Sequence, residues 1–170
     1  MSYLFVAFDY TMNRFFTLII AKVIFMVDRL TPEQRHKNMQ RIRNKDSDIE
    51  LLLRKELWRR GLHYRKNVKH IVGCPDIAFK GLKIAVFCDS DFWHGYDWLN
   101  RKDDFKTNRE FWIAKIERNM IRDQEVNELL ISNGWYVLRF WGKQIKQDVS
   151  YCADMIEQAV EERRRCYIKQ

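Results

Sequence analysis

The residues best suited to chemistry follow a short apolar run near the middle of the chain. That run, residues 83–88, leads to Asp89 and then to Phe92, Trp93 and His94. A buried strand that ends in a carboxylate, two large aromatic rings and an imidazole is an unusual way to build a core. The same groups suit a site that unstacks bases and hydrolyses a phosphodiester, so they predict a metal-dependent DNA nuclease.

Carboxylates near this run are expected to hold a divalent metal ion. Phosphodiester hydrolysis needs an activated water and stabilisation of charge, and Mg²⁺ held by one or two carboxylates can provide both. Asp76 begins one predicted strand and Asp89 ends its expected hairpin partner, so the two can meet at one edge of a sheet. Glu50 is a further candidate, but its position three residues after Ser47 also fits a capping box at a helix start.

His94 is the candidate proton donor or acceptor. A positioned imidazole can protonate the leaving oxygen or orient the attacking water, whereas a lone histidine is more often an ordinary polar residue. Asn119 and Asp123 have the spacing of one helix face, and a carboxylate bonded to an imidazole fixes its tautomer. Asp123 is therefore the expected partner of His94, and a surface ion pair with Arg122 is the alternative.

Three aromatic residues are predicted to contact DNA bases. Phe92, Trp93 and Trp112 can act as wedges between base pairs, which costs roughly a few kcal/mol per step and less at a mismatch. Core packing is the alternative, especially for Trp112. It is less suited to Phe92 and Trp93, because neighbours on an extended segment point in opposite directions.

The positive charge of the chain is concentrated in one block. The formal net charge is +8, and residues 29–69 carry 13 basic and five acidic residues, which accounts for all of it. Such a block attracts phosphate-bearing partners, although a solvated helical face has the same composition. Arg41, Arg43 and Lys45 are predicted to contact DNA phosphates, and Asn119 is assigned to the same DNA-binding set.

The 170 residues fit one domain with an N-terminal extension. Residues 1–27 are largely apolar, but the stretch 15–27 is interrupted by Lys22 and is shorter than a membrane span. We expect translation to begin at Met26, with a membrane anchor as the alternative, and residues 28–170 to form a single endonuclease domain. The four cysteines lack CxxC or zinc-ligand spacing, which favours a reducing cytoplasm.

Capping signals and hydrophobic periodicity predict an α/β sandwich with a mixed central sheet flanked by helices. The expected helices cover residues 32–43, 47–61, 107–132 and 149–165, with capping boxes at Ser47 and Thr107. The expected strands cover residues 62–65, 76–79, 83–88 and 135–141, with 83–88 as the buried central strand.

The ordered motifs from Thr31 to Gly142 resemble the very-short-patch repair endonucleases, which nick DNA beside T:G mispairs left by deamination of 5-methylcytosine. The stretches that carry the resemblance are Thr31 to Arg35, Asp46 to Glu50, Gly73-x-Pro75-Asp76, Phe92-Trp93-His94-Gly95, Thr107 to Trp112, Lys115-Ile116-x-x-Asn119, Arg122-Asp123 and Gly134-Trp135-x-Val137-Leu138. Several motifs in one register are more specific than any one of them.

The resemblance implies a restriction-endonuclease-like fold of the PD-(D/E)XK type and Mg²⁺-dependent nicking of double-stranded DNA that holds a T:G mispair. We also expect a cytoplasmic enzyme that works with mismatch-repair proteins, and no membrane association if residues 1–25 are not translated. The resemblance implies that Asp76 is the principal Mg²⁺ ligand together with the backbone carbonyl of Cys88, that Glu50 assists through water, and that Asp89 is a base or a second metal carboxylate. It implies that His94 is the catalytic histidine and that Asp123 is its partner. The intercalating aromatic residues would be Phe92, Trp93 and Trp112.

The chain departs from this family around its Phe-Trp-His motif. The family commonly has cysteines and histidine there that bind a structural zinc, whereas Asp91 precedes the motif here and Tyr96 and Trp98 follow it. We therefore expect no zinc, and expect packing of Tyr96 and Trp98 to hold residues 95–106. The alternative functions are a restriction or defence nuclease without strict mismatch specificity, and a catalytically silent DNA-binding module.

Overall fold

The computed structural model describes Thr31, Glu33, Gln34, Lys37 and residues 45–105 and 108–168. For residues 167 and 168 only the backbone is described. The chain divides into two units, Met1–Arg43 and Asn44–Gln170. In the first unit, Thr31 and Gln34 exchange hydrogen bonds between side chain and backbone, as expected at a helix start. Arg41, Arg43, most of the predicted helix 32–43 and the expected boundary after residue 27 lie outside the described residues.

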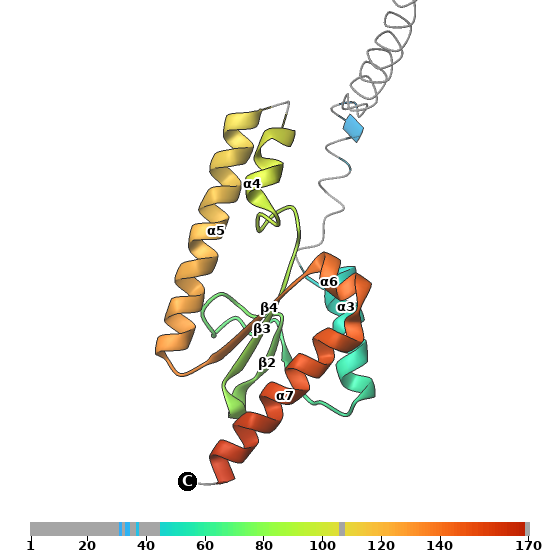
Figure 1. Ribbon diagram of the computed structural model, residues 1–170, viewed down its shortest axis with the longest axis vertical. Coiled ribbons are helices and arrows are strands. Elements are labelled where there is room, and N and C mark those ends of the chain that lie inside the picture. The colour runs from blue at the N-terminus through green and yellow to red at the C-terminus, as the bar shows by residue number, and fades with distance from the viewer. Residues whose placement is uncertain (1–30, 32, 35–36, 38–44, 106–107, 169–170) are drawn as a thin grey trace, which may run out of the picture. The chain divides into compact units, whose positions relative to one another are not determined.

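A four-stranded mixed sheet forms the centre of the second unit (Figure 1). Its strands, in spatial order, are β1 (Arg65–Lys66), β2 (Ile77–Phe79), β3 (Ile84–Asp89) and β4 (Tyr136–Trp141). The β1–β2 and β2–β3 pairs are antiparallel, whereas β3 and β4 are parallel. The predicted α/β class with a mixed sheet is therefore confirmed.

Helices cover both faces of this sheet. In Figure 1, α5 (Arg109–Ser132) lies on one side, and α3 (Asp48–Arg59), α6 (Gly142–Gln147) and α7 (Val149–Ile168) lie on the other. Alternate residues of β3 face the two layers: Val86 packs with the α3 and α7 residues, whereas Phe87 packs with Leu130 of α5. Both faces of β3 are buried, as the apolar run predicted.

Helix starts and strand limits differ from the prediction in places. The capping box at Ser47 is present, but α5 begins after Asn108, which has a φ of 50° and makes no side-chain capping bond. Thr107 lies outside the described residues. The first strand begins at Arg65 and not at Leu62, because the Leu62 N–H bonds back to Leu57 and its side chain is buried in the core.

Four short elements between the longer helices and strands were not predicted. They are α4 (Trp98–Arg101), α6 and the 3₁₀ turns η1 (Lys80–Leu82) and η2 (Lys102–Asp104). Each is shorter than the two helical turns needed to show an apolar period. Within the described part of the chain, no helix is long and apolar enough to cross a membrane.

Candidate active site

The predicted site residues gather at one edge of the sheet, where β3 and β4 end. Because these two strands are parallel, Asp89 and Trp141 end side by side, and the following segments leave from the same edge. Asp76 lies at this edge also, because it precedes β2, which runs antiparallel to β3. The topology thus brings together groups that are far apart in sequence.

Asp76 is held against β3 by a backbone hydrogen bond. The Cys88 N–H donates to Oδ2 of Asp76 at 2.7 Å. Burial raises the pKa of Asp76 to about 6; the Cys88 hydrogen bond opposes this shift and the negative charge of Glu50 adds to it. A carboxylate in such surroundings is stabilised by a cation beside it, which is the electrostatic condition of a metal ligand.

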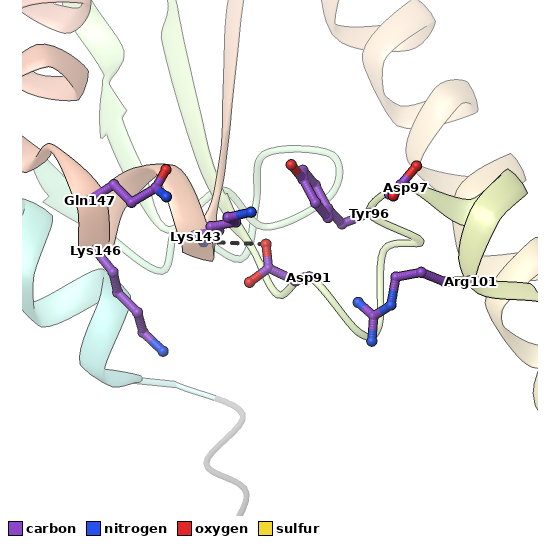
Figure 2. A pocket seen from close by; sticks show the side chains of 7 residues that line it. All are labelled: Asp91, Tyr96, Asp97, Arg101, Lys143, Lys146 and Gln147. Carbon is purple, nitrogen blue, oxygen red and sulfur yellow. Dashed lines mark hydrogen bonds between the residues drawn. The ribbon is translucent and has the colours of Figure 1, made fainter. Parts of the chain in front are cut away.

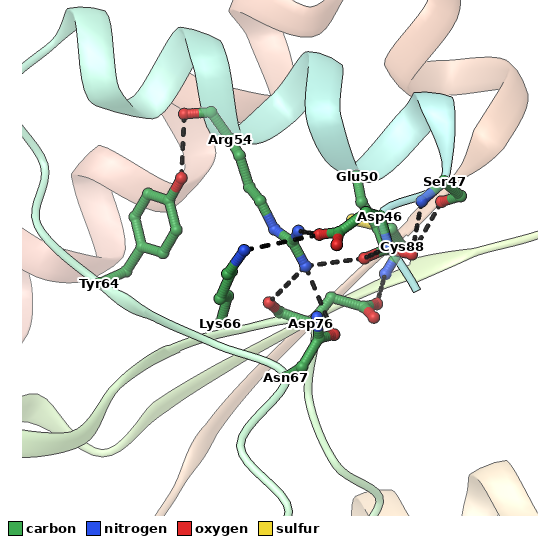
Figure 3. A network of polar contacts seen from close by, with 9 residues as sticks. All are labelled: Asp46, Ser47, Glu50, Arg54, Tyr64, Lys66, Asn67, Asp76 and Cys88. Atoms are coloured by element: carbon green, nitrogen blue, oxygen red, sulfur yellow. Dashed lines mark hydrogen bonds and ion pairs between the residues drawn. The ribbon is translucent and has the colours of Figure 1, made fainter. Parts of the chain in front are cut away.

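Glu50 lies near Asp76, but its acceptor positions are occupied (Figure 3). One oxygen accepts from the N–H and the hydroxyl of Ser47, and the other accepts from the Asp46 N–H and from Nη2 of Arg54. An ionised carboxylate accepts about four hydrogen bonds, so Glu50 has no lone pair left for a metal ion. The capping interpretation accounts for its position, and a role through water stays a prediction.

Arg54, which the sequence analysis did not single out, links Glu50 to Asp76 (Figure 3). Its guanidinium contacts the carboxylates of Asp46 and Glu50, the side-chain oxygen of Asn67 and the main-chain carbonyl of Asp76. Arg54 is only 6% exposed, and a buried cation requires such partners. Its position four residues after Glu50 on the buried face of α3 is the signal that could have identified it.

His94 and Asp123 are in direct contact. Nδ1 of His94 lies 2.5 Å from Oδ2 of Asp123 and 3.6 Å from Oδ1 of Asp89. Burial opposes ionisation of Asp123, but the hydrogen bond to His94 and the positive charges of His94 and Arg139 lower its pKa below the ordinary value. Asp123 therefore stays ionised as an acceptor for the Nδ1 proton. The predicted pairing is present, and the ion pair with Arg122, at 3.7 Å, is secondary.

Arg139 binds both carboxylates of this cluster and was also missed. Its Nε and Nη2 donate to the two oxygens of Asp89 at 2.6 and 2.7 Å, and Nη2 lies 3.3 Å from Oδ1 of Asp123. The guanidinium also stacks over Phe87, 4.8 Å from the ring centroid. A charged residue inside the otherwise apolar β4 is the signal that could have found it, because such a residue needs a carboxylate partner.

Asp89 differs from its predicted setting beside Asp76. It is 5% exposed, and its carboxylate is engaged by Arg139 and not shared with Asp76. The reason is strand alternation: Asp89 is on the Phe87 face of β3, toward Arg139 and α5, whereas Asp76 bonds to the backbone of Cys88. Asp89 is still close enough for its charge to raise the pKa of Asp76 slightly.

The three predicted wedge residues form one aromatic cluster. Phe92 lies 4.9 Å from Trp93 and 5.6 Å from Trp112, and Trp93 lies 5.8 Å from Trp112, between ring centroids. The expectation that Phe92 and Trp93 point in opposite directions is wrong, because residues 91–97 form a turn and not a strand. All three rings are half-buried, so the cluster combines mutual packing with an accessible edge.

Two residues of the DNA-binding prediction are described outside this cluster. The amide of Asn119 donates to the main-chain carbonyl of Trp93 at 3.0 Å, so Asn119 positions the aromatic turn. Lys45 is exposed. Lys115, which was not assigned a role, lies 4.9 Å from the centroid of the Trp93 ring and places a positive charge beside the cluster.

The turn that carries His94 is anchored on both sides. Tyr96 packs edge-on against Trp141, and Trp98 packs on Phe105 and lies 3.4 Å from a Glu117 oxygen through Nε1. These are the two packing contacts expected to hold the loop. Gly95 lies so close to α5 that an added Cβ would be 2.5 Å from Sδ of Met120, and its φ is +74°.

Gly95→Ala is expected to destabilise the protein by about 1–3 kcal/mol, because alanine is strained at this φ and collides with α5. Single-turnover nicking should fall as well, since the change displaces the turn carrying His94. Gly81→Ala is the matched control, because nothing lies within 4 Å of a Cβ there. Equal urea midpoints for the two variants would show that Gly95 is not under this constraint.

Oxygen atoms are the metal ligands on offer around Asp76. Among the described residues, no group of three or more His, Cys, Asp and Glu side chains is arranged to hold a metal ion. In a strand the N–H and C=O of one residue point to the same side, so the Cys88 carbonyl faces Asp76 as its N–H does. One carboxylate and a carbonyl suit Mg²⁺, which keeps several waters when bound.

Comparison with known proteins identifies the family. The family model described as DNA mismatch endonuclease Vsr matches residues 27–100. The chain is 53% identical to the Type II nicking enzyme V.HpaIIP of Haemophilus parainfluenzae over 138 residues, covering 81% of this chain and 98% of that protein. It is 52% identical to the Type II nicking enzyme V.NmeDIP of Neisseria meningitidis serogroup C, covering 81% and 93%.

A more distant relative carries the family's own name. The chain is 33% identical to the DNA mismatch endonuclease Vsr of Escherichia coli over 116 residues, covering 68% of this chain and 74% of that protein. Identities of this size over most of each relative exceed what a shared fold alone would give. The chain therefore belongs to the Vsr family of DNA mismatch endonucleases and is a DNA endonuclease.

Proposed function

We propose that the chain nicks one strand of duplex DNA beside T:G mispairs that arise from deamination of 5-methylcytosine, in very-short-patch mismatch repair. The observation that carries this proposal is that one edge of the sheet holds both Asp76, with a pKa of about 6, and the His94–Asp123 pair. An aromatic cluster, Phe92 with Trp93 and Trp112, adjoins the same turn.

Asp76 and the carbonyl of Cys88 are the proposed ligands of Mg²⁺. When bound, the ion would supply positive charge to the scissile phosphate and acidify a coordinated water. The protein itself holds Asp76 in place with two hydrogen bonds. The Cys88 N–H donates to the Asp76 carboxylate, and Arg54 donates to the Asp76 main-chain carbonyl. Glu50 acts by fixing Arg54 and the start of α3.

His94 is the proposed proton carrier. With its Nδ1 proton donated to Asp123, the imidazole keeps Nε2 free to accept a proton from the attacking water or, once protonated, to give one to the leaving oxygen. Asp123 fixes this tautomer, as a carboxylate does beside a catalytic imidazole. Arg139 holds Asp123 and Asp89, and its positive charge offsets the repulsion between these two neighbouring carboxylates.

The aromatic cluster is the proposed reader of the mispair. Unstacking a base step costs roughly a few kcal/mol, and the cost is lower where pairing is already weakened. Rings that are partly exposed and prepacked against each other lose little conformational entropy on insertion. Specificity for T:G would then come from the lower cost of opening the mispair together with contacts to the exposed bases.

We also propose that the fold is restriction-endonuclease-like, of the PD-(D/E)XK type. The mixed sheet flanked by helices, with Asp76 at its edge, supports this proposal. A second function keeps the same chemistry: nicking in a restriction or defence role without strict mismatch specificity. The observation that favours it is the name Type II nicking enzyme carried by two similar relatives.

The proposed function is tested with a T:G duplex labelled separately on each strand and incubated with Mg²⁺ or with a chelator. Only the T-containing strand should be cut, and only with Mg²⁺. Because the pKa of Asp76 is about 6, protonation competes with the metal, so the Mg²⁺ concentration needed for half-maximal rate should rise below about pH 6. Cutting of both strands, or undiminished cutting in chelator, contradicts the proposal.

No structural zinc is needed in the loop after β3 in this proposal. Asp91 accepts a hydrogen bond from the Lys143 N–H at 3.2 Å, and Tyr96 packs on Trp141, so direct contacts join the turn to the end of β4. Purified protein is expected to contain far less than one zinc per chain, and a zinc chelator should leave its thermal midpoint unchanged. Stoichiometric zinc whose removal lowers the midpoint would refute this prediction.

A further inference from the structure

An open hollow lies at the same edge of the sheet, beside the turn that carries His94 (Figure 2). Its volume is about 500 Å³, and it is lined by Asp91, Tyr96, Asp97, Arg101, Lys143, Lys146 and Gln147. Ligand sites have volumes of roughly 300–1,000 Å³, so the hollow has room for a small polar group. None of its lining residues belongs to the proposed catalytic or metal-binding groups, although Asp91 and Tyr96 anchor the neighbouring turn.

The cations of the hollow come from two separate elements that face each other. Lys143, Lys146 and Gln147 lie on one face of α6, and Arg101 ends α4 across the opening (Figure 2). Within the described residues, neither lysine has a salt-bridge partner, and Arg101 has only a loose one, 3.8 Å from Asp104. These positive charges are available to a ligand.

The two carboxylates of the hollow already have partners. Asp91 accepts from the Lys143 N–H at 3.2 Å, and Asp97 accepts from the side-chain amide of Asn100 at 2.7 Å. Three cations against two such carboxylates leave an excess of positive charge. Tyr96 forms one wall, and its ring lies 5.7 Å from Nζ of Lys143, which keeps this ammonium group over the hollow.

The hollow lies next to the proposed cleavage site in the chain. Asp91 follows Asp89 by two residues, Tyr96 follows His94 by two, and Lys143 follows the end of β4 by two. Any duplex whose phosphate reaches Asp76 and His94 must lie across this edge. Duplex DNA carries one negative charge per about 1.7 Å of helix axis, so other phosphates of the substrate pass close by.

We propose that the hollow between α4 and α6 binds a backbone phosphodiester of the DNA substrate, with Lys143, Lys146 and Arg101 as the cationic contacts. This inference rests on the proposed DNA-nicking function but not on its T:G specificity. The hollow acts through charge and not through base contacts, so it fixes the register of the duplex at the active edge for any sequence.

The first test measures the salt dependence of binding to a T:G duplex in the presence of chelator, which prevents cutting. For Lys146→Met and Lys143→Met, the slope of log affinity against log salt should become less steep by about 0.9 for each phosphate that the variant no longer neutralises. Lys80→Met is the matched control, because Lys80 is exposed in η1 at the opposite end of β3. Equal slopes for all three variants and the unmodified protein would overturn the proposal.

The second test identifies the phosphate. One neutral methylphosphonate linkage is placed in turn at each position around the mispair, and binding of the unmodified protein and of Lys146→Met is compared. At one or two adjacent linkages, neutralisation should weaken the unmodified protein several-fold but weaken the variant much less, because the variant has no ammonium group to pair with that phosphate. Absence of any such position contradicts the proposal, whereas loss of mismatch preference with this pattern intact would contradict only the proposed specificity.

A third test asks whether the ligand of the hollow is a free anion and not a DNA phosphodiester: inorganic phosphate is titrated into the unmodified protein and the variants at constant ionic strength. If the variants bound inorganic phosphate more weakly while their salt slopes on DNA stayed unchanged, the hollow would belong to a free anion and the DNA assignment would be wrong.

Discussion

Asp76→Asn is expected to reduce single-turnover nicking by about a thousandfold or more while leaving DNA binding nearly unchanged. The substitution removes the charge that holds the metal, and loss of several kcal/mol of transition-state stabilisation corresponds to about this factor. Asparagine keeps an oxygen that can accept from the Cys88 N–H, so the local structure should survive. Nicking of a T:G duplex and its dissociation constant in chelator are the two quantities to measure.

The same variant should be more stable than the unmodified protein at neutral pH. A carboxyl group whose pKa is raised by folding binds its proton more tightly in the folded state. In the metal-free protein its contribution to stability is therefore fully present below the ordinary pKa of 3.8 and lost as pH rises through about 6. Asp76→Asn removes this loss, which amounts to about 3 kcal/mol at most.

Urea unfolding in chelator at about pH 4 and about pH 7.5 tests the prediction, because the stability gain should appear only at the higher pH. Mg²⁺ should then stabilise the unmodified protein and not the variant, since only the former binds it. Asp154→Asn on α7 is the matched control: it removes one of several partners of Arg60, so it should leave activity unchanged and should not raise stability at the higher pH. A variant that is less stable at both pH values, or one that still nicks, would show that Asp76 is not the metal ligand.

His94→Ala is expected to lower the nicking rate by about 10²–10⁴-fold, the usual contribution of a positioned acid or base. Asp123→Asn should also slow nicking, because it removes the acceptor that fixes the Nδ1 proton. The double variant should be little slower than His94→Ala, since the two residues act as a unit and their effects are not additive. Affinity for DNA should change little in all three.

His70→Ala provides the control for the histidine substitution, because His70 is exposed in a turn and is not one of the proposed catalytic residues. Fully multiplicative losses in the double variant would mean that Asp123 acts independently of His94. A His94→Ala protein with the rate of the His70→Ala control would remove His94 from the mechanism.

Much of the fold follows from local signals in the sequence. The apolar run ending at Asp89 is a central strand, the capping box at Ser47 starts α3, and α5 ends before Gly134, which has a φ of +78°. These features depend on neighbours within a few residues, which the sequence displays directly. The pairing of His94 with Asp123 also follows from motif order, although 29 residues separate them.

The parts that could not be predicted depend on contacts between distant elements. Arg139 and Arg54 each join segments that meet only in the folded chain. The residues next to each arginine in sequence do not predict which carboxylates it binds. The turn that brings Phe92 and Trp93 together has no proline and no glycine before Gly95, so the sequence suggested an extended segment. The placement of Asp89 on the Arg139 side depends on which face of β3 each neighbouring helix covers.

The central claim, mismatch-directed nicking, is tested most directly by one comparison. Two duplexes identical except for a single T:G mispair in one of them are incubated with the unmodified protein and Mg²⁺ under single-turnover conditions. The account predicts a nick beside the mispaired T and none at the same place in the fully paired duplex. Equal rates on both duplexes would contradict it and would leave a nuclease that does not recognise the mispair.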